Sequence, residues 1–324
     1  MPLPTLDSLD LKLLQALQLD GRAPFKRIAS VLGVSDQTVA RRYRRLLAAV
    51  DLRVLGRTDD ARLARQNWIV RLHCTPDVAE RLAGALAKRP DTIYVALMSG
   101  GTEVICGMKP RSTRERDELL LERLPRTPHV GSVTAHCLLH RFYGGPLGWL
   151  AKIDALDRSQ QEALRPPAPA PLEDPVLLDA ADDELLALLS RDGRSTLSTL
   201  QTVTGQPESA VKRRLDRLRS TGVLYFDVQY DHATMGHDVQ AMLWLTVAPH
   251  ATTAAGQALA SHPEVQFASA TTGLANLVVF GLFRSPEHVY AYLSDKIGSL
   301  EGIRSAETAF ILRQVKQLTY EPSR

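Results

Sequence analysis

The sequence of 324 residues has little cysteine and no long apolar run. The three cysteines, Cys74, Cys106 and Cys137, are sparse and odd in number, which argues against a disulfide framework and predicts a reducing cytoplasm. No apolar run approaches the ~20 residues that a membrane span needs, and the N-terminus lacks a basic and then apolar export signal. We therefore expect a cytoplasmic protein with no membrane partner.

Motifs of enzyme chemistry are also missing. No phosphate-binding glycine loop, nucleophile elbow or paired-carboxylate motif stands out. The pairs His73-Cys74 and His136-Cys137, with His140, are the right ligand types for zinc. Adjacent residues on a strand point to opposite faces, however, so neither pair can converge on one ion. We expect these residues to pack in a sheet, and we expect no metal, no cofactor and no enzymatic activity.

Charge is unevenly distributed along the chain. The net charge is +3, yet residues 1–172 carry 26 Lys and Arg against 18 Asp and Glu, and residues 173–324 carry 13 against 18. A basic half of this kind indicates a nucleic-acid partner. A charge excess alone more often reflects a solvated surface, so the positions of the basic residues decide whether they form a nucleic-acid-binding surface.

The most informative feature is an internal duplication. Residues 10–46 align with residues 182–218 without a gap, at an offset of 172, and 14 of the 37 positions are identical. The identities include the sequence Asp-Gly-Arg, at 20–22 and at 192–194, and an Arg-Arg pair. A period this long indicates a duplicated domain rather than a solenoid repeat.

Each copy predicts three short helices. In the first copy, leucines at helical spacing precede Gly21, which is expected to supply the positive φ of a helix exit. Gly33 ends a second short helix, and Ser35 is placed to cap a third. Two helices joined by a turn that contains glycine, the second with a basic and amide-rich face, form the helix-turn-helix pattern. The alternative is a surface helix whose arginines keep it soluble, and the duplication argues against it.

The outer face of the third helix suits duplex DNA. Gln and Arg near its start can pair with adenine and guanine edges, and later arginines can neutralise phosphates. Asp216 replaces Arg44 in the second copy, so we expect that copy to bind more weakly or to be architectural. The β-rich segment after each third helix is expected to form a wing. The predicted DNA-binding residues are Ser35, Gln37, Thr38, Arg41, Arg42, Arg44, Arg45, Arg53 and Arg57, and in the second copy Ser209, Lys212, Arg213 and Arg217.

The segment after each helix-turn-helix has the order strand, helix, strand, strand, helix, strand. It begins at Trp68 in the first copy, and the second copy follows at an offset of 173. This is the order of a ferredoxin-like sandwich, in which the fourth strand neighbours the first. The predicted fold class is therefore α+β: two winged helix-turn-helix domains alternate with two ferredoxin-like βαββαβ sandwich domains.

A winged helix-turn-helix that opens with Leu9-Asp10 and ends its first helix with Asp-Gly-Arg, followed by such a sandwich, resembles the Lrp/AsnC family of transcriptional regulators. The resemblance covers both halves, so the chain resembles a fused dimer of family members. It implies dimerisation and larger assembly through the sandwich domains, and an amino acid or related small metabolite as effector. The effector-binding residues that it implies are Met98, Ser99, Gly100, Thr102 and Glu103, and in the second copy Thr271, Thr272, Gly273 and Asn276.

The position of the usual family Asp is Glu103 in one copy and Asn276 in the other, so the two pockets are expected to differ in ligand, or one to be empty. A linker with a short helix over 149–164 and a proline-rich run is expected to act as a semi-rigid spacer that leaves both helix-turn-helix units free. The expected domains are a winged helix-turn-helix at 1–60, a sandwich at 66–143, the helix and Pro-rich linker at 144–178, a second winged helix-turn-helix at 179–235 and a second sandwich at 238–320.

Two alternatives stay open at this point. The sirohaem decarboxylases resemble Lrp/AsnC regulators in fold and can occur as fused pairs; His232, His237 and Arg141 would then be candidates beside a tetrapyrrole. The other alternative is an architectural DNA-compacting protein without an effector. The base-reading face of the first copy favours a sequence-specific regulator that binds double-stranded DNA and a small effector, forms a homo-oligomer and associates with the nucleoid.

Overall fold

The computed structural model describes residues 6–316. They form two compact units, one of residues 6–64 and 145–236 and the other of residues 65–144 and 237–316. Each unit therefore combines a segment from both halves of the duplicated chain. The predicted α+β fold class is confirmed. Among residues 6–316, no helix is both long and apolar enough to cross a membrane.

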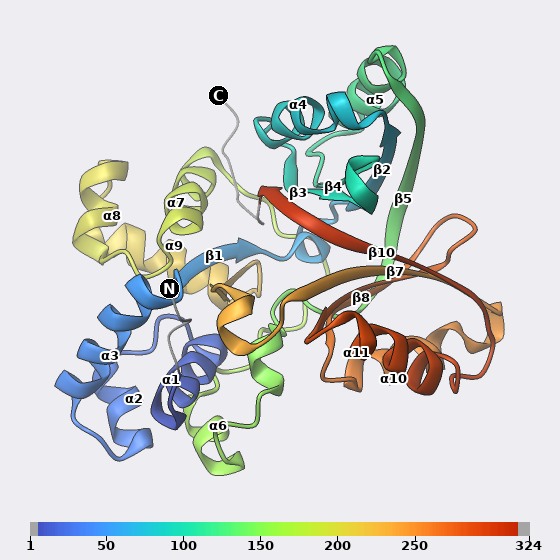
Figure 1. Ribbon diagram of the computed structural model, residues 1–324. Coiled ribbons are helices and arrows are strands. Elements are labelled where there is room, and N and C mark those ends of the chain that lie inside the picture. Colours follow the sequence, from blue (N-terminus) through green and yellow to red (C-terminus); the bar gives the residue numbers. More distant parts are fainter. Residues whose placement is uncertain (1–5, 317–324) are drawn as a thin grey trace. The chain divides into compact units, whose positions relative to one another are not determined.

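The first unit contains two three-helix modules of the same design (Figure 1). Module 1 consists of α1 (Ser8–Leu19), α2 (Phe25–Leu32) and α3 (Asp36–Ala49). Module 2 consists of α7 (Ala180–Arg191), α8 (Leu197–Thr204) and α9 (Glu208–Ser220). Both modules are held together by buried aliphatic side chains at matching repeat positions. These are Leu13, Leu14, Leu17, Val39 and Leu46 in module 1 and Leu185, Leu186, Leu189, Val211 and Leu218 in module 2.

The glycines of the repeated Asp-Gly-Arg turns differ from expectation. Helix α1 ends at Asp20, whose backbone is extended (φ −142°, ψ 95°), and Gly21 does not have a positive φ. A Cβ on Gly21 would lie 2.6 Å from Cβ of Phe226 and 2.7 Å from Cγ1 of Val54. The predicted positive φ at Gly21 was therefore wrong: glycine is needed there because a strand packs against the turn. Gly33, at the end of α2, does have the left-handed conformation (φ 67°).

The strands that follow α3 and α9 pair with each other. β1 (Arg53–Thr58) and β6 (Leu224–Gln229) are antiparallel, with Arg53 opposite Gln229 and Thr58 opposite Leu224. We call this pair the shared ribbon. The expectation of one wing per module was wrong, because a single short strand leaves its backbone groups unpaired and the two modules satisfy them mutually.

The linker is docked on both modules. Its predicted helix is broken into a 3₁₀ turn (Trp149–Lys152) and α6 (Arg158–Leu164). The buried Gln15 side chain of α1 donates to the carbonyl oxygen of Ala151 at 3.2 Å and accepts from the backbone nitrogen of Leu156 at 2.7 Å. After the prolines, the backbone nitrogen of Ala170 donates to the carbonyl oxygen of Ser220 at 2.9 Å. The sequence predicted a spacer that leaves both helix-turn-helix modules free. The structure differs, because the linker packs against both modules.

The second unit contains two copies of the predicted βαββαβ order. The first copy is β2 (Trp68–Cys74), α4 (Pro76–Ala87), β3 (Thr92–Met98), β4 (Glu103–Met108), α5 (Thr113–Asp117) with a π-helical extension to Arg123, and β5 (Val130–Tyr143). The second copy is β7 (Val239–Val247), α10 (Thr252–Ser261), β8 (Val265–Thr271), β9 (Leu277–Phe283), α11 (Pro286–Ala291) with a π-helical extension to Ile297, and β10 (Ile303–Lys316).

The eight strands close into one barrel in the order β10-β3-β4-β2-β5-β8-β9-β7. The closure depends on the two 14-residue strands β5 and β10, green and red in Figure 1. The first part of each pairs within its own copy, with β2 or β7, and the last part pairs with the other copy, with β8 or β3. A central core that includes Ile69, Ile105, Met242 and Trp244 joins the two copies.

Candidate nucleic-acid interface

Helix α3 of module 1 is fixed at its start and along its inner face. The Ser35 hydroxyl caps the helix by accepting a hydrogen bond from the backbone nitrogen of Thr38 at 3.1 Å. Val39 and Leu46 are buried on the inner face. Because this face is anchored, the side chains on the opposite face have a defined direction toward solvent.

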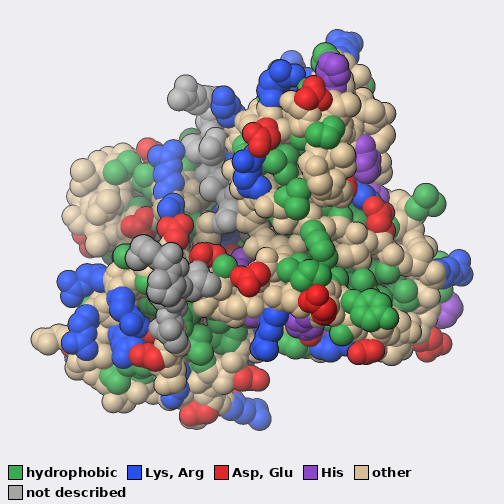
Figure 2. Space-filling view, in the orientation of Figure 1, with side chains coloured by type: hydrophobic (Ala, Val, Ile, Leu, Met, Phe, Trp, Pro, Cys, Tyr) green, Lys and Arg blue, Asp and Glu red, His purple; other side chains and the backbone are tan. Residues whose placement is uncertain are grey.

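The outer face of α3 carries the polar side chains that the sequence predicted. Gln37, Arg41 and Arg44 are exposed, and basic side chains gather over α3 in Figure 2. Among residues 6–316, Arg41 makes no hydrogen bond or ion pair, so its guanidinium is available to a ligand. A hollow of about 390 Å³ on this face is lined by Ser35, Gln37, Thr38, Ala40, Arg41 and Arg44.

Two other predicted DNA-binding arginines of α3 form ion pairs within module 1, and the side chain of Arg45 stays 50% exposed. Arg42 donates to Asp10 at 3.1 Å and to Asp7, and Arg45 donates to the second oxygen of Asp10, which is fully buried. The hydrogen bond from Arg42 lowers the pKa of Asp7 to about 2. Arg42 and Arg45 therefore hold α3 against the start of α1. We call these four residues the Asp–Arg cluster.

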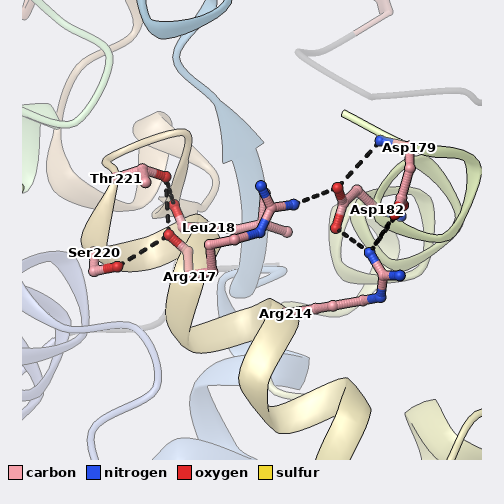
Figure 3. Close-up of polar contacts among 7 residues, drawn as sticks. All are labelled: Asp179, Asp182, Arg214, Arg217, Leu218, Ser220 and Thr221. Carbon is pink, nitrogen blue, oxygen red and sulfur yellow. Dashed lines mark hydrogen bonds and ion pairs between the residues drawn. The ribbon is translucent and has the colours of Figure 1, made fainter. Parts of the chain in front are cut away.

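Module 2 contains the same cluster at the same repeat positions (Figure 3). Arg214 donates to Asp179 at 2.7 Å and to Asp182 at 2.9 Å, and Arg217 donates to the other oxygen of the buried Asp182. The cluster is present although module 2 has lost most of the predicted base-reading residues. The cluster is thus part of the architecture of each module, and Arg217 has the same structural role as Arg45.

The outer face of α9 in module 2 is more acidic. Ser209, Lys212 and Arg213 are exposed, as a phosphate-binding surface requires, but so are Glu208 and Asp216. Pro207 precedes the helix, which has no side-chain cap. Carboxylates on this face repel phosphates, so the two modules present recognition helices of different charge.

Of the two predicted DNA-binding arginines in the shared ribbon, one is exposed and the other is buried. Arg53 is exposed and forms an ion pair with Asp51 at 3.1 Å. Arg57 is 7% exposed. Burial lowers the pKa of its guanidinium, and the negative charge of the nearby Asp227 opposes this change. A buried guanidinium cannot reach a DNA phosphate, so the structure removes Arg57 from the predicted DNA-binding set.

The implied effector residues of the first copy surround the turn between β3 and β4. Met98 is fully buried, and Glu103 is 1% exposed. The Glu103 carboxylate accepts from Nε of Arg71 at 2.6 Å and from the hydroxyl of Ser99 at 3.0 Å. Thr102 is exposed, and its hydroxyl donates to the carbonyl oxygen of Ser99 at 2.7 Å. Glu103 therefore supports the turn and is not free to bind an amino group.

Ser99 and Gly100 open onto an apolar groove of about 460 Å³ between this turn and the second copy. Tyr290 and Leu312 in the groove are 73% and 58% exposed, and hydrophobic side chains are visible over α11 and β10 in Figure 2. The remaining lining residues are Pro286, Val289, Leu293, Thr308, Ala309 and Phe310.

The implied effector residues of the second copy are occupied by contacts within the barrel. Asn276 accepts from the backbone nitrogen of Val247 at 2.8 Å and donates to its carbonyl oxygen at 2.9 Å. The Thr271 hydroxyl donates to the carbonyl oxygen of Ala275, and the Thr272 hydroxyl accepts from the backbone nitrogen of Cys137. A Cβ on Gly273 (φ 111°) would lie 2.7 Å from Nδ1 of His136. The two turns are therefore not equivalent.

The histidines and cysteines of β2 and β5 do not form a metal site. These strands are neighbours, as predicted, but no group of three or more His, Cys, Asp or Glu side chains among residues 6–316 is placed to hold a metal ion. The ring of His136 packs on Trp244 with centroids 4.9 Å apart, and Cys106 is buried, which raises the pKa of its thiol to about 12.

The sequence did not predict two groups of interacting charged residues. In the second unit, the buried Arg71 joins the buried Glu103 to the exposed Glu307 of the second copy, with its guanidinium carbon 4.6 Å from the centroid of the Trp244 ring. In the first unit, Arg22 and Arg194 each reach the other module. The first group left no signal, because its members are far apart in sequence. The second was visible only as an identity between the two repeats.

Comparison with known proteins agrees with this architecture. Residues 6–47 match the AsnC-type helix-turn-helix domain, residues 178–225 a winged helix-turn-helix DNA-binding domain and residues 240–320 the Lrp/AsnC ligand binding domain. An HTH-type transcriptional regulator of Pyrococcus furiosus is 30% identical over 145 residues, which are 97% of that protein and 44% of this chain. The chain belongs to the Lrp/AsnC family. It is a DNA-binding transcriptional regulator with a small-molecule-binding domain.

Other Lrp/AsnC relatives have about half the length of this chain. The regulator FL11 of Pyrococcus furiosus is 28% identical over 147 residues, 97% of that protein and 45% of this chain. Among solved structures, the siroheme decarboxylase NirDL superposes with a TM-score of 0.66 at 13% identity and covers 98% of this chain and 94% of its own. At that identity the likeness shows the fold alone, and it extends over both units of this chain.

Proposed function

We propose that this Lrp/AsnC regulator is sequence-specific and reads DNA with module 1. Gln37, Thr38 and Arg41 contact base edges in the major groove, and Arg44 neutralises a phosphate. Lys212 and Arg213 of module 2 contribute phosphate contacts without reading bases, with Ser209 beside them. The single observation that carries this proposal is the exposed outer face of α3, on which Arg41 has no partner among the described residues.

The test is selection of binding sites from a randomised duplex library with the whole chain and with Gln37→Ala. The parent should enrich a site, and Gln37→Ala should relax preference at one or two base pairs while it keeps affinity for unrelated DNA. The matched control is Ser209→Ala, at the same repeat position in module 2, which should leave the enriched site unchanged. Identical enriched sites for parent and Gln37→Ala would show that α3 does not read the sequence.

We further propose that the effector is an amino acid with an apolar side chain, or a related metabolite, in the groove beside Ser99 and Gly100. The apolar lining and the exposed Tyr290 support this class of ligand. A ligand that binds only the native state raises the free energy of unfolding, by about 2.7 kcal/mol when its concentration is 100 times its Kd, and so raises the melting temperature. A thermal-shift screen of the standard amino acids should show a rise that Gly100→Trp abolishes. No rise with any of them would contradict this effector class and favour the architectural alternative.

A sirohaem decarboxylase-like enzyme is the second candidate, because the likeness to NirDL covers both units. We propose that the chain is not an enzyme, since a decarboxylase would not need the base-reading face of α3. Titration with sirohaem or haem distinguishes the two: a tetrapyrrole enzyme should shift the Soret band, and the regulator should not. We also propose that the protein is a homo-oligomer in the cytoplasm and that it associates with the nucleoid through the basic face of α3.

A further inference from the structure

We infer that Arg22 and Arg194 lock the two modules into one rigid DNA-binding body, so that a single chain contacts one duplex at two places a fixed distance apart. One contact reads bases through α3, and the other holds phosphates through α9. This inference rests on the proposed DNA-binding function, although the rigidity of the pair can be tested without DNA.

The two arginines make reciprocal hydrogen bonds between the modules. Arg22 donates through Nη1 to the carbonyl oxygen of Gly193 at 2.7 Å. Arg194, at the same position of the other repeat, donates through Nη1 to the carbonyl oxygen of Gly21 at 2.6 Å and through Nη2 to that of Ala23 at 3.1 Å. Each arginine of an Asp-Gly-Arg turn therefore binds the backbone of the opposite turn. We call this arrangement the arginine clasp.

Aromatic rings and the shared ribbon enclose the clasp. The Arg194 guanidinium lies 4.5 Å from the centroid of the Phe25 ring, and that of Arg22 lies 5.8 Å from the Phe226 ring. Burial lowers the pKa of both guanidinium groups. Hydrogen bonds to charged donors are stronger when water is excluded. The half-buried clasp is therefore a firm contact and not a mobile surface pair.

Backbone contacts and one ion pair lie beside the clasp and support the same geometry. The backbone nitrogen of Gly193 donates to the carbonyl oxygen of Val54 at 2.7 Å, so the second turn is also bound to the ribbon. A Cβ on Gly193 would lie 2.9 Å from that same oxygen. Arg219 adds an ion pair with Asp20 at 3.3 Å. Two turns, two arginines and two paired strands together leave the modules little freedom to move relative to each other.

A rigid pair has a specific consequence for DNA binding. Once α3 has bound its site, α9 is presented to the duplex at high effective concentration, which strengthens binding by the order of 10²-fold even where the second contact alone is weak. Because the pair is rigid and its two faces differ in charge, the second contact falls on one side of the base-read site. The clasp thus determines where the weak module touches DNA.

The first experiment measures rigidity without DNA. Spin labels are placed at Ser30→Cys and Thr202→Cys, exposed residues at matching repeat positions, in a Cys137→Ser background that leaves only the buried Cys74 and Cys106. Electron double-resonance should give one narrow distance distribution for the parent and a broadened one for Arg22→Ala/Arg194→Ala. The control is Arg191→Ala, an exposed arginine of α7, which should keep the narrow distribution.

The second experiment locates the phosphate contacts. Single methylphosphonate substitutions along the selected duplex should reveal two clusters of sensitive phosphates for the parent, one at the base-read site and one at a fixed distance to one side. Arg22→Ala/Arg194→Ala should keep the first cluster and lose the second. For this double variant, the slope of the logarithm of the DNA-binding constant against the logarithm of the salt concentration should become shallower by about 2. Each phosphate contact contributes about 0.9 to the slope, and Lys212 and Arg213 make two such contacts.

The outcomes separate the clasp from the proposed function. Equal distance distributions in parent and double variant would overturn the clasp, and so would a second phosphate cluster that survives in the double variant. If the parent gives a narrow distance distribution but binds no duplex DNA, the proposed function is wrong and the clasp still holds. If the double alanine variant does not fold, Arg22→Lys/Arg194→Lys keeps both charges without the two-pronged donor geometry and should broaden the distribution to a smaller extent.

Discussion

Module 1 and module 2 share one architecture and differ in their outer faces. Most of the identical residues of the two repeats build the module or join it to its copy: the buried leucines, the Asp–Arg cluster and the Asp-Gly-Arg turns. Arg41 and Arg213 are an exception, because they are identical and exposed. The residues that differ, such as Gln37 against Ser209 and Arg44 against Asp216, lie on the exposed faces of α3 and α9. Most of the basic residues that the repeats share are therefore structural, and we expect any difference in DNA reading between the modules to come from the residues that they do not share.

The largest expected effect comes from the Asp–Arg cluster, and it should be similar in both modules. Asp10→Ala or Asp182→Ala removes a buried carboxylate and leaves Arg45 or Arg217 without its ion-pair partner, whereas Arg42 and Arg214 keep their pairs with Asp7 and Asp179. Each change should lower the free energy of unfolding by about 2–3 kcal/mol, less than a fully buried pair because the arginines are partly exposed. Urea unfolding followed by helix circular dichroism measures this. A large loss for one module and none for the other would break the proposed equivalence of the two clusters.

The comparison is sharpened at the matched positions Arg41 and Arg213. Arg41→Ala should weaken binding to the selected site by about 1–3 kcal/mol and relax its sequence preference, because a base contact is lost. Arg213→Ala should weaken binding to all duplexes equally and reduce the salt slope by about 1. Fluorescence anisotropy on selected and scrambled duplexes at several salt concentrations distinguishes the two. A sequence-dependent loss for Arg213→Ala would mean that both modules read bases.

The side chains that give α3 and α9 different charges can be exchanged between the two helices. Asp216→Arg gives module 2 the side chain that module 1 has at Arg44, and it should steepen the salt slope by about 0.9 if the new guanidinium meets a phosphate. The reverse change, Arg44→Asp, should flatten the slope by a similar amount. The control is Asp183→Arg, which adds the same charge on α7 rather than on the outer face of α9. An equal effect for the control would mean that net charge alone, and not the face of α9, sets the affinity.

The smallest expected effect is a pH dependence of the Asp–Arg cluster. The pKa of Asp7 is lowered to about 2 by the hydrogen bond from Arg42. A depressed carboxylate pKa contributes stability above its unfolded value of about 3.9, and this contribution is lost as the pH falls toward 2. Because Asp7 is half exposed, Asp7→Asn should cost under about 1 kcal/mol at pH 7 and nothing near pH 2. Unfolding curves of parent and variant that stay apart at pH 2 would contradict this assignment.

Much of the fold follows from local patterns. Helical spacing of leucines, the αL glycine at Gly33 and the cap at Ser35 placed the helices of module 1, and the offset of 173 placed the second sandwich. These signals are local in the chain, so no tertiary information was needed. The outer face of α3 was visible for the same reason, because a helix with a buried stripe exposes the opposite positions.

The contacts that the sequence did not predict occur where residues far apart in the sequence meet. Arg42 and Arg45 lie on α3 and Arg57 lies in β1. Nothing in their local sequence indicates that the first two form ion pairs with Asp10 or that Arg57 is buried in the shared ribbon. Gly21 was expected to adopt a positive φ because its position follows a helix, yet the strand packed against it is the reason for glycine.

The sequence by itself determined that the chain contains two helix-turn-helix modules and two sandwiches, and that only the first module has a glutamine and an arginine at positions 37 and 44 of its third helix, because periodicity and residue type are local properties. Only the tertiary structure decided that two wings become one ribbon, that β5 and β10 each divide their pairing between two copies and that Arg22 and Arg194 join the modules. The physical reason is that strand pairing and charge neutralisation depend on which partner is near in space, and separation along the chain does not specify that.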